Sequence, residues 1–253
     1  MVNITMKDTT MRELKRYLTE EEQRRLLTVV KTQAGPLAQR DYAWMRLLIE
    51  TGMRVNELAT LSLDQAERAL ATGWLVVRAD QRKGHGVKPK PGEAKKPAKR
   101  VGHEYMVTEP VRQCLEALTH LHHELRPVLQ MAPEVVPPLL WGRCGVVKGV
   151  TLHEHMSVRS FQVRMKHWAY LSGLPDGVSP HWLRHTRGVN IIRRSRGNNP
   201  LKVAQLALGH ASIASTGIYT QMSREEYSRE LQNVAGGRMR QADARKYSMG
   251  AAA

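Results

Sequence analysis

Apolar residues recur every three or four positions along most of this chain, which predicts a mainly helical protein. In residues 39–50, for example, Tyr42, Met45 and Leu48 share one helical face. The same spacing predicts further helices over these segments: 108–125, 157–171, one that begins at Pro180, 201–208 with Gly209 as its stop, and one near Ser215.

Several expected helix ends carry residues that satisfy free backbone groups. Thr19 is followed three residues later by a glutamate, and this capping-box pattern predicts the start of the first helix. Gly52 is expected to end the 39–50 helix, and Asn56 is expected to cap a short helix after it. Ser179 and Pro180 predict a sharp helix start, because a capping serine precedes a proline in the first turn.

The apolar spacing changes between residues 74 and 107. Residues 74–77 form a short β-favouring run, and 101–107 is expected to return as its partner strand. Between them, 81–100 is rich in Gly, Pro and Lys and is expected to be a long mobile loop. Residues 127–149, with four prolines and three glycines, are also expected to be a loop. The prediction is a mainly α-helical fold with a small antiparallel β-hairpin whose tip is strongly basic.

The charge of the chain narrows the class of partner. Its 253 residues are enough for one sizeable domain. Lysine and arginine outnumber aspartate and glutamate by 39 to 23, which gives a formal net charge of +16. This excess favours a polyanionic partner such as nucleic acid, although ribosome-associated and membrane-surface proteins share such a charge.

No apolar run approaches the length of a membrane span, and the first residues lack the apolar core of a signal peptide. Cys114 and Cys144 show no metal-binding spacing, and the fold does not need a disulfide between them. We therefore expect a cytoplasmic protein with no membrane partner.

The segment HWLRHT places His181, Arg184 and His185 on one face at the start of a helix. The planar guanidinium of arginine matches phosphate oxygens, and histidine can donate, accept or transfer a proton near neutral pH. One phosphate held by all three side chains would explain the cluster. Exposed basic residues at a helix start, or a histidine packed under a loop, would explain it equally well.

Two further segments carry related chemistry. LGHASIASTGIYT contains His210 and, nine residues later, Tyr219, whose phenolate nearby Arg and Lys would favour. TGMRVNELATL places Arg54 after a helix-ending glycine, where backbone N–H groups and the guanidinium can bind an anion and Glu57 can support the arginine. The simpler interpretations are a tyrosine packed on a helix and a solvent-facing Arg–Glu pair.

Taken together, these three segments resemble the motifs of the tyrosine recombinase (phage integrase) family, in the family's order. The resemblance covers roughly residues 18–229 and implies the family's DNA breaking-rejoining catalytic fold. It implies that Arg54 and Arg184 hold the scissile phosphate, and that His181 hydrogen-bonds it and helps to take the tyrosine proton. His210 would bind a phosphate oxygen, and Tyr219 would attack phosphorus to form a 3′-phosphotyrosine and release a 5′-hydroxyl.

The family also uses a lysine on a β-hairpin as general acid to the leaving 5′-oxygen. Lys83 follows the 74–77 strand at about the right distance and is our candidate, with Lys96 second. The simpler interpretation is that the lysines of this loop are solvated and contact the DNA backbone, and it applies to most of them. His185 matches the family motif and is expected to support its helix.

The implied chemistry uses no metal, cofactor or nucleotide. Two arginines and a histidine stabilise the reacting phosphate, and a covalent tyrosyl link conserves the free energy of the broken bond. The motifs contain no paired carboxylates, and the sequence contains no Walker motif. The remaining clustered histidines are expected on exposed polar surfaces: His120, His122, His123, His153 and His155.

The chain divides into an N-terminal extension (1–17), a catalytic domain (18–235) with its basic hairpin loop near 81–100, and a C-terminal tail (236–253) expected to be flexible. No separate N-terminal core-binding domain is evident, and the basic loop 82–100 is a candidate substitute for its grip on double-stranded DNA. The family docks its C-terminal segment on a neighbouring subunit of a tetramer. Residues 225–234 would do so here, unless they pack within their own chain.

The expected function is therefore site-specific DNA recombination by strand exchange. A non-catalytic DNA-binding protein would instead use 201–221 as a helix-turn-helix, but that interpretation leaves Arg54, His181 and Arg184 without a role. A type IB topoisomerase or a telomere resolvase would share the chemistry and differ in the fate of the covalent intermediate.

Overall fold

The computed structural model describes residues 17–82, 101–129, 137–147, 150–197 and 199–210. The mainly helical fold with a small antiparallel sheet is confirmed. Among the described helices, none has both the length and the apolar character that a membrane crossing requires. The elements in chain order are α1 (Glu20–Lys31), α2 (Pro36–Thr51), α3 (Val55–Ala59), α4 (Leu63–Thr72), β1 (Trp74–Val77), β2 (His103–Met106), α5 (Glu109–Leu129), β3 (Trp141–Val147), β4 (Val150–His155), α6 (Val158–Leu171), α7 (Pro180–Arg194) and α8 (Pro200–Leu208).

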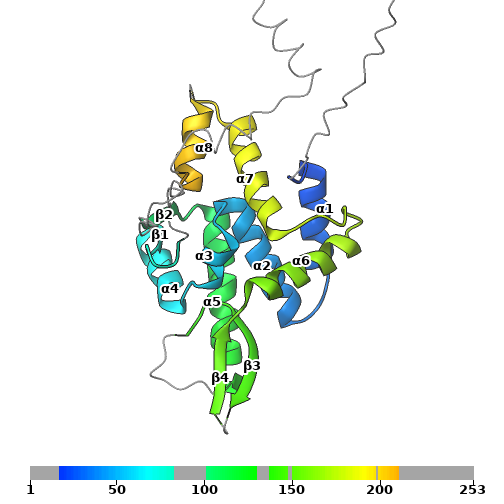
Figure 1. The fold of residues 1–253 in the computed structure, drawn as a ribbon, viewed down its shortest axis with the longest axis vertical. Coiled ribbons are helices and arrows are strands. Elements are labelled where there is room, and N and C mark those ends of the chain that lie inside the picture. Colours follow the sequence, from blue (N-terminus) through cyan, green and yellow to red (C-terminus); the bar gives the residue numbers. More distant parts are fainter. Residues whose placement is uncertain (1–16, 83–100, 130–136, 148–149, 198, 211–253) are drawn as a thin grey trace, which may run out of the picture. The chain divides into compact units, whose positions relative to one another are not determined.

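Helix α2 lies at the centre of the hydrophobic core, because buried residues cover most of its circumference. It packs against α1, α5 and α7, and Figure 1 shows it next to α5 in the middle of these elements. Trp44 of α2 is fully buried and meets Phe161 of α6 edge to face, with ring centroids 5.1 Å apart. Such an aromatic pair contributes about 1 kcal/mol beyond the area it buries.

A buried carboxylate on α2 forms hydrogen bonds and an ion pair with α6. Asp41 has no exposed surface, and its two oxygens accept hydrogen bonds from the indole N–H groups of Trp44 (2.9 Å) and Trp168 (2.8 Å). Arg40 and Arg164 supply the positive charge that a buried carboxylate needs. The two helices are therefore held together by charged as well as apolar contacts.

Most helix ends lie where the sequence predicts them. Thr19 caps α1 in a capping box, and Ser157 and Ser179 directly precede α6 and α7. Gly52 and Gly209 end α2 and α8 in the left-handed conformation, with φ values of 70° and 60°. This conformation favours glycine, which has no β-carbon to clash with the backbone.

Strands β1 and β2 form the predicted antiparallel hairpin, with Trp74 opposite Met106. Alternation along the strands buries Leu75, Val77 and Tyr105 in the core and leaves the other face exposed. The lysine-rich residues 83–100 between the strands lie outside the described residues.

The expectation of a loop over residues 127–149 is wrong for most of the part that the structure describes. Helix α5 continues to Leu129, and β3 pairs with β4 so that Trp141 lies opposite His155 and Val147 lies opposite Val150. All four prolines of this segment precede β3 in the sequence, so they do not interrupt the strand. The glycines of this segment favour a loop in the sequence pattern, whereas a short two-stranded hairpin tolerates the two that lie within β3.

His122 contradicts the expectation of exposed histidines outside the motifs. It is fully buried on α5 and meets the Trp141 ring with centroids 4.3 Å apart. The imidazole therefore packs as part of the core at an apolar position of the helix. The structure does not describe the side chain of His153. Three other histidines are exposed as expected: His120, His123 and His155.

Candidate active site

Arg54 lies at the junction between α2 and α3. The expected cap at Asn56 is wrong, because α3 already begins at Val55 and Arg54 is its N-cap. The Glu57 carboxylate accepts a hydrogen bond from the Arg54 backbone N–H at 2.9 Å and pairs with the Arg54 guanidinium at 2.9 Å. This double contact fixes the direction of the Arg54 side chain, of which 24% stays exposed.

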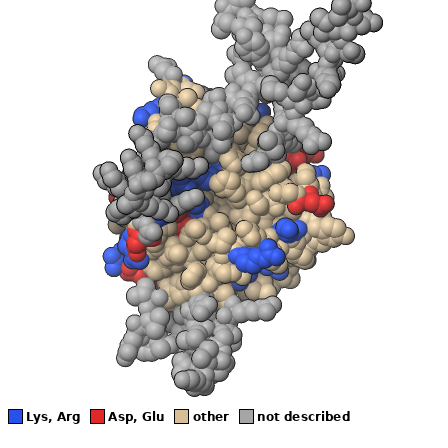
Figure 2. All heavy atoms as spheres, in the orientation of Figure 1, with Lys and Arg blue, Asp and Glu red and all other residues tan. Residues whose placement is uncertain are grey.

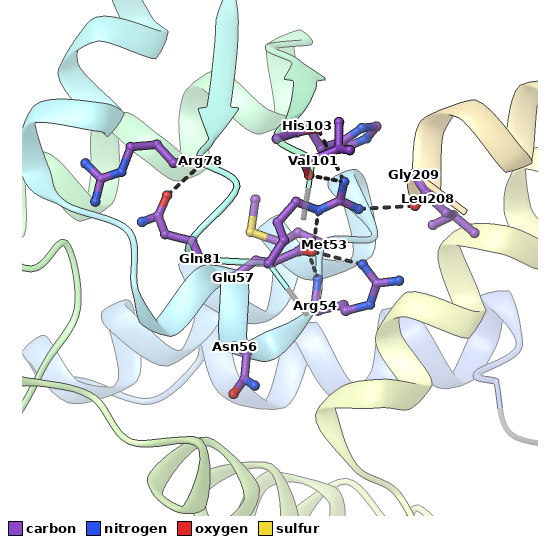
Figure 3. Close-up of polar contacts among 12 residues, drawn as sticks. Met53, Arg54, Asn56, Glu57, Arg78, Gln81, Val101, His103, Leu208 and Gly209 are labelled. Atoms are coloured by element: carbon purple, nitrogen blue, oxygen red, sulfur yellow. Dashed lines mark hydrogen bonds and ion pairs between the residues drawn. The ribbon is translucent and has the colours of Figure 1, made fainter. Parts of the chain in front are cut away.

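Glu57 connects Arg54 to two other parts of the chain. Burial alone would raise the pKa of this carboxyl, but hydrogen bonds from the Arg54 backbone, Tyr105 and Arg82 outweigh burial and hold the pKa below its ordinary value. The Tyr105 hydroxyl donates at 2.8 Å and the Arg82 Nε at 3.0 Å. Figure 3 shows Glu57 beside Arg54 within this polar network. The ionised carboxylate therefore joins α3 to β2 and to the segment after β1.

Arg184 lies near the start of α7 and has only 2% of its surface exposed. Its Nη1 donates to the Gly52 carbonyl at 2.5 Å, and its Nη2 donates to the Leu208 carbonyl at 2.7 Å. Both carbonyls belong to helix C-termini, which lack intrahelical donors and carry partial negative charge. Arg184 thereby joins the end of α2 to the end of α8.

Gly52 allows these helices to approach closely. Besides its positive φ, a β-carbon added there would overlap the side chains of Leu208 and Arg187. Helices α7 and α8 therefore lie against the bare α-carbon of Gly52, and Arg54 follows only two residues later. This contact brings Arg54 to the same side of the domain as α7.

Three histidines gather beside these arginines. His181 and His185 lie one turn apart on α7, with ring centroids 4.5 Å apart at an interplanar angle of 84°. His181 is exposed and His185 is half-buried. His210 follows the end of α8, where its backbone N–H donates to the Gln205 carbonyl at 3.0 Å.

The surroundings of His210 show that these residues lie close to it. The pKa of His210 is lowered to about 4, first by burial and then by the positive charges of Arg184, Arg54 and the two α7 histidines. A charge shifts a neighbour's pKa appreciably only over a few ångströms. The structure therefore brings together four of the six residues that the sequence singled out: Arg54, His181, Arg184 and His210.

The two other candidates, Lys83 and Tyr219, lie outside the described residues. Lys83 directly follows Arg82 in the sequence, and Tyr219 comes nine residues after His210. Lys96 and the expected docking segment 225–234 also lie outside the described residues.

Two residues of this polar network were not singled out from the sequence. The sequence places Arg82 in the basic loop expected to grip DNA, and this expectation is wrong for Arg82 because only 7% of it is exposed. Nothing in the sequence separates it from the lysines that follow. Tyr105 alternates with exposed residues on β2, and this alternation is the signal that could have placed it inside.

The charge on the surface agrees with a large anionic ligand. Figure 2 shows Lys and Arg side chains gathered near the centre of one face, with Asp and Glu mainly toward its edges. The net charge of +16 adds a long-range attraction for polyanions. Within the described residues, no three His, Cys, Asp or Glu side chains are grouped so that they could hold a metal ion.

The fold and this cluster together define a tyrosine recombinase catalytic domain. The chain belongs to the phage integrase family, whose model matches residues 16–226.

Among its relatives, the tyrosine recombinase XerC of Neisseria meningitidis serogroup C is 28% identical over 212 residues, which are 84% of this chain and 57% of that protein. The tyrosine recombinase XerD of Pseudomonas aeruginosa is 30% identical over 212 residues, which are 83% of this chain and 59% of that protein. The chain thus spans somewhat more than half the length of these curated relatives.

Solved structures agree on the fold. The crystal structure of XerA recombinase superposes with a TM-score of 0.58 at 23% identity, covering 87% of this chain and 64% of that one. The Tn1549 transposon integrase, in complex with transposon right end DNA, gives a TM-score of 0.58 at 16% identity, covering 91% of this chain and 69% of that one.

Proposed function

We propose that this chain cleaves and rejoins double-stranded DNA at specific sites through a covalent 3′-phosphotyrosine intermediate. The observation that carries the proposal is the set of two arginines and two α7 histidines around His210. Like charges held together lower the stability of a fold, so such a cluster is typical of a site that binds an anion. A protein that only binds DNA does not need these arginines and histidines clustered around one histidine.

The arginines would stabilise the negative charge that grows on the reacting phosphate. Glu57 holds the Arg54 guanidinium before DNA arrives, so little reorganisation is needed when the phosphate binds. His210 is neutral at pH 7 because its pKa is lowered to about 4. A neutral imidazole carries one N–H, which would donate to a non-bridging phosphate oxygen.

The covalent step exchanges one oxygen on phosphorus for another. The phenol oxygen of Tyr219 attacks phosphorus, and the bond from phosphorus to the 5′-oxygen breaks. His181 accepts the phenol proton, and Lys83 gives a proton to the departing 5′-oxygen. The 5′-hydroxyl of a second strand then attacks the phosphotyrosine and reverses these steps, which joins two DNA partners without external energy.

The oligomeric state and the cellular location follow from the same proposal. Relatives over most of the chain are named tyrosine recombinases. Strand exchange requires two duplexes, each cut on both strands, so we place four copies on DNA and assign residues 225–234 to the contact between neighbours. A DNA substrate is consistent with the cytoplasmic location expected from the sequence.

Covalent capture tests this function. The full chain is incubated with a randomised library of nicked duplexes in EDTA, and SDS-stable adducts are recovered and sequenced. Wild type is expected to yield an adduct, and Tyr219→Phe none. Tyr170→Phe, which alters a tyrosine of α6 that is 79% exposed, is the matched control and keeps the adduct.

The other outcomes separate the rival functions. Binding of the library without any adduct would identify a non-catalytic DNA-binding protein. Relaxation of supercoiled plasmids regardless of their sequence would identify a topoisomerase.

A further inference from the structure

Arg82 is a basic residue at the start of a basic loop, yet its side chain turns into the domain. Three of its nitrogens bind three different segments. Nε donates to Glu57 Oε1 at 3.0 Å, Nη1 donates to the Val101 carbonyl at 3.1 Å, and Nη2 donates to the Gly209 carbonyl at 3.1 Å. Figure 3 shows Glu57, Val101 and Gly209 around this point.

The contact with Gly209 is tight. A β-carbon added to Gly209 would lie 2.6 Å from Arg82 Nη2 and 3.0 Å from His103 Nδ1. The Nε2 of His103 also lies 3.3 Å from the Ala207 carbonyl. Arg82 and His103 therefore hold the end of α8 directly before His210.

We propose that Arg82 is a positioning residue that sets the place of His210 relative to Arg54. The same oxygen, Glu57 Oε1, accepts from Arg54 Nη1 at 2.9 Å and from Arg82 Nε at 3.0 Å. Arg82 therefore links the carboxylate behind Arg54 to the backbone that precedes His210. The catalytic consequence of this link rests on the proposed function.

A simple structural ion pair and a positioning residue make different demands on position 82. A buried counter-ion for Glu57 needs only a positive charge, which lysine would supply. Contact with three acceptors in three directions needs the planar fork of arginine, because an ammonium is a compact point charge. Arg82→Lys therefore separates the two roles. Arg78→Lys is the matched control, since the Arg78 side chain is 63% exposed and pairs with Asp80, which is also exposed.

The first test is the titration of His210 in the free protein by NMR, with His210→Gln to assign its signal. The charged groups that act on His210 are Arg54 and the α7 residues Arg184, His181 and His185. Arg82 and His103 contact Gly209, the residue before it. Release of the backbone before His210 admits water to the ring, so its pKa is expected to rise by about one pH unit in Arg82→Lys. The pKa stays at about 4 in Arg78→Lys.

The second test uses a duplex recovered by covalent capture. At saturating protein, the single-turnover cleavage rate of Arg82→Lys is expected to fall about tenfold, because misplaced groups stabilise the transition state poorly. The dissociation constant for the same duplex is expected to change by less than about threefold, since affinity comes from many backbone contacts.

Each result decides the inference. A wild-type rate and an unchanged His210 pKa in Arg82→Lys would overturn it. Loss of folding in both Arg82→Lys and Arg82→Gln would also overturn it, because Arg82 would then serve the core alone. If wild type forms no adduct with any duplex, the proposed function fails, and the NMR titration still decides whether Arg82 positions His210.

Discussion

At the scale of single residues, the site accommodates positive charge in two ways. Arg184 is buried as an ion, and the carbonyls at the ends of α2 and α8 offset the cost of its burial. His210 lies among the same charges and instead gives up its proton, because its pKa is lowered to about 4. One group would thus attract the phosphate by charge, and the other would bind it by a neutral hydrogen bond.

The lowered pKa of His210 predicts a pH dependence of stability. The ring titrates near 6.5 in the unfolded chain and near 4 in the folded chain, so between these values the unfolded state binds more protons. The free energy of unfolding therefore falls as the pH drops from 7 to 5. Because solvent screens this half-buried ring, we expect a contribution of about 1 kcal/mol.

Urea denaturation of wild type and His210→Gln at both pH values measures this contribution. Wild type is expected to lose about 1 kcal/mol more than the variant between pH 7 and pH 5. Equal losses in the two proteins would contradict the assigned environment of His210.

At the scale of elements, the buried Asp41 links α2 to α6 through a hydrogen bond and an ion pair. In Asp41→Asn, Arg164 would face a neutral amide, although 29% of the Arg164 side chain is exposed to water. We expect the free energy of unfolding to fall by about 2–3 kcal/mol, measured by urea denaturation. In Asp64→Asn, which breaks the exposed pair with Arg68, the change is expected to stay within about 0.5 kcal/mol. Similar losses in both variants would show that Asp41 does not carry this link.

The elements that the sequence predicted well depend on local chemistry. Thr19 caps α1 through a glutamate three residues away, and Gly52 ends α2 through its own backbone conformation. The α7 cluster also follows from local spacing, since His181 and Arg184 share a face whatever the rest of the fold does. Motif spacing thus predicted the helix that carries two of the candidate residues, His181 and Arg184.

The features that the sequence did not predict depend on distant partners. His122 is buried because Trp141 packs on it, and Arg82 is buried because Glu57 and Gly209 accept its hydrogen bonds. Each outcome depends on a tertiary contact that no local pattern contains.

At the scale of the whole molecule, the domain joins its predicted catalytic residues through helix ends. The ends of α2 and α8 meet at Arg184, and Arg54 and His210 follow those two ends in the sequence. The chain spans somewhat more than half the length of its curated relatives, and recombination by a tetramer is a proposal. Cleavage by the cluster around His210 is the claim on which that proposal depends.

Peptide mapping of the captured adduct by mass spectrometry tests this claim most directly. After digestion with trypsin and nuclease, the account predicts a nucleotide joined through its 3′-phosphate to the peptide that contains Tyr219, with a free 5′-hydroxyl on the released strand. Adduct formation in EDTA is part of the same prediction. A nucleotide on another residue, or a 5′-phosphate attached to the protein, would contradict the account.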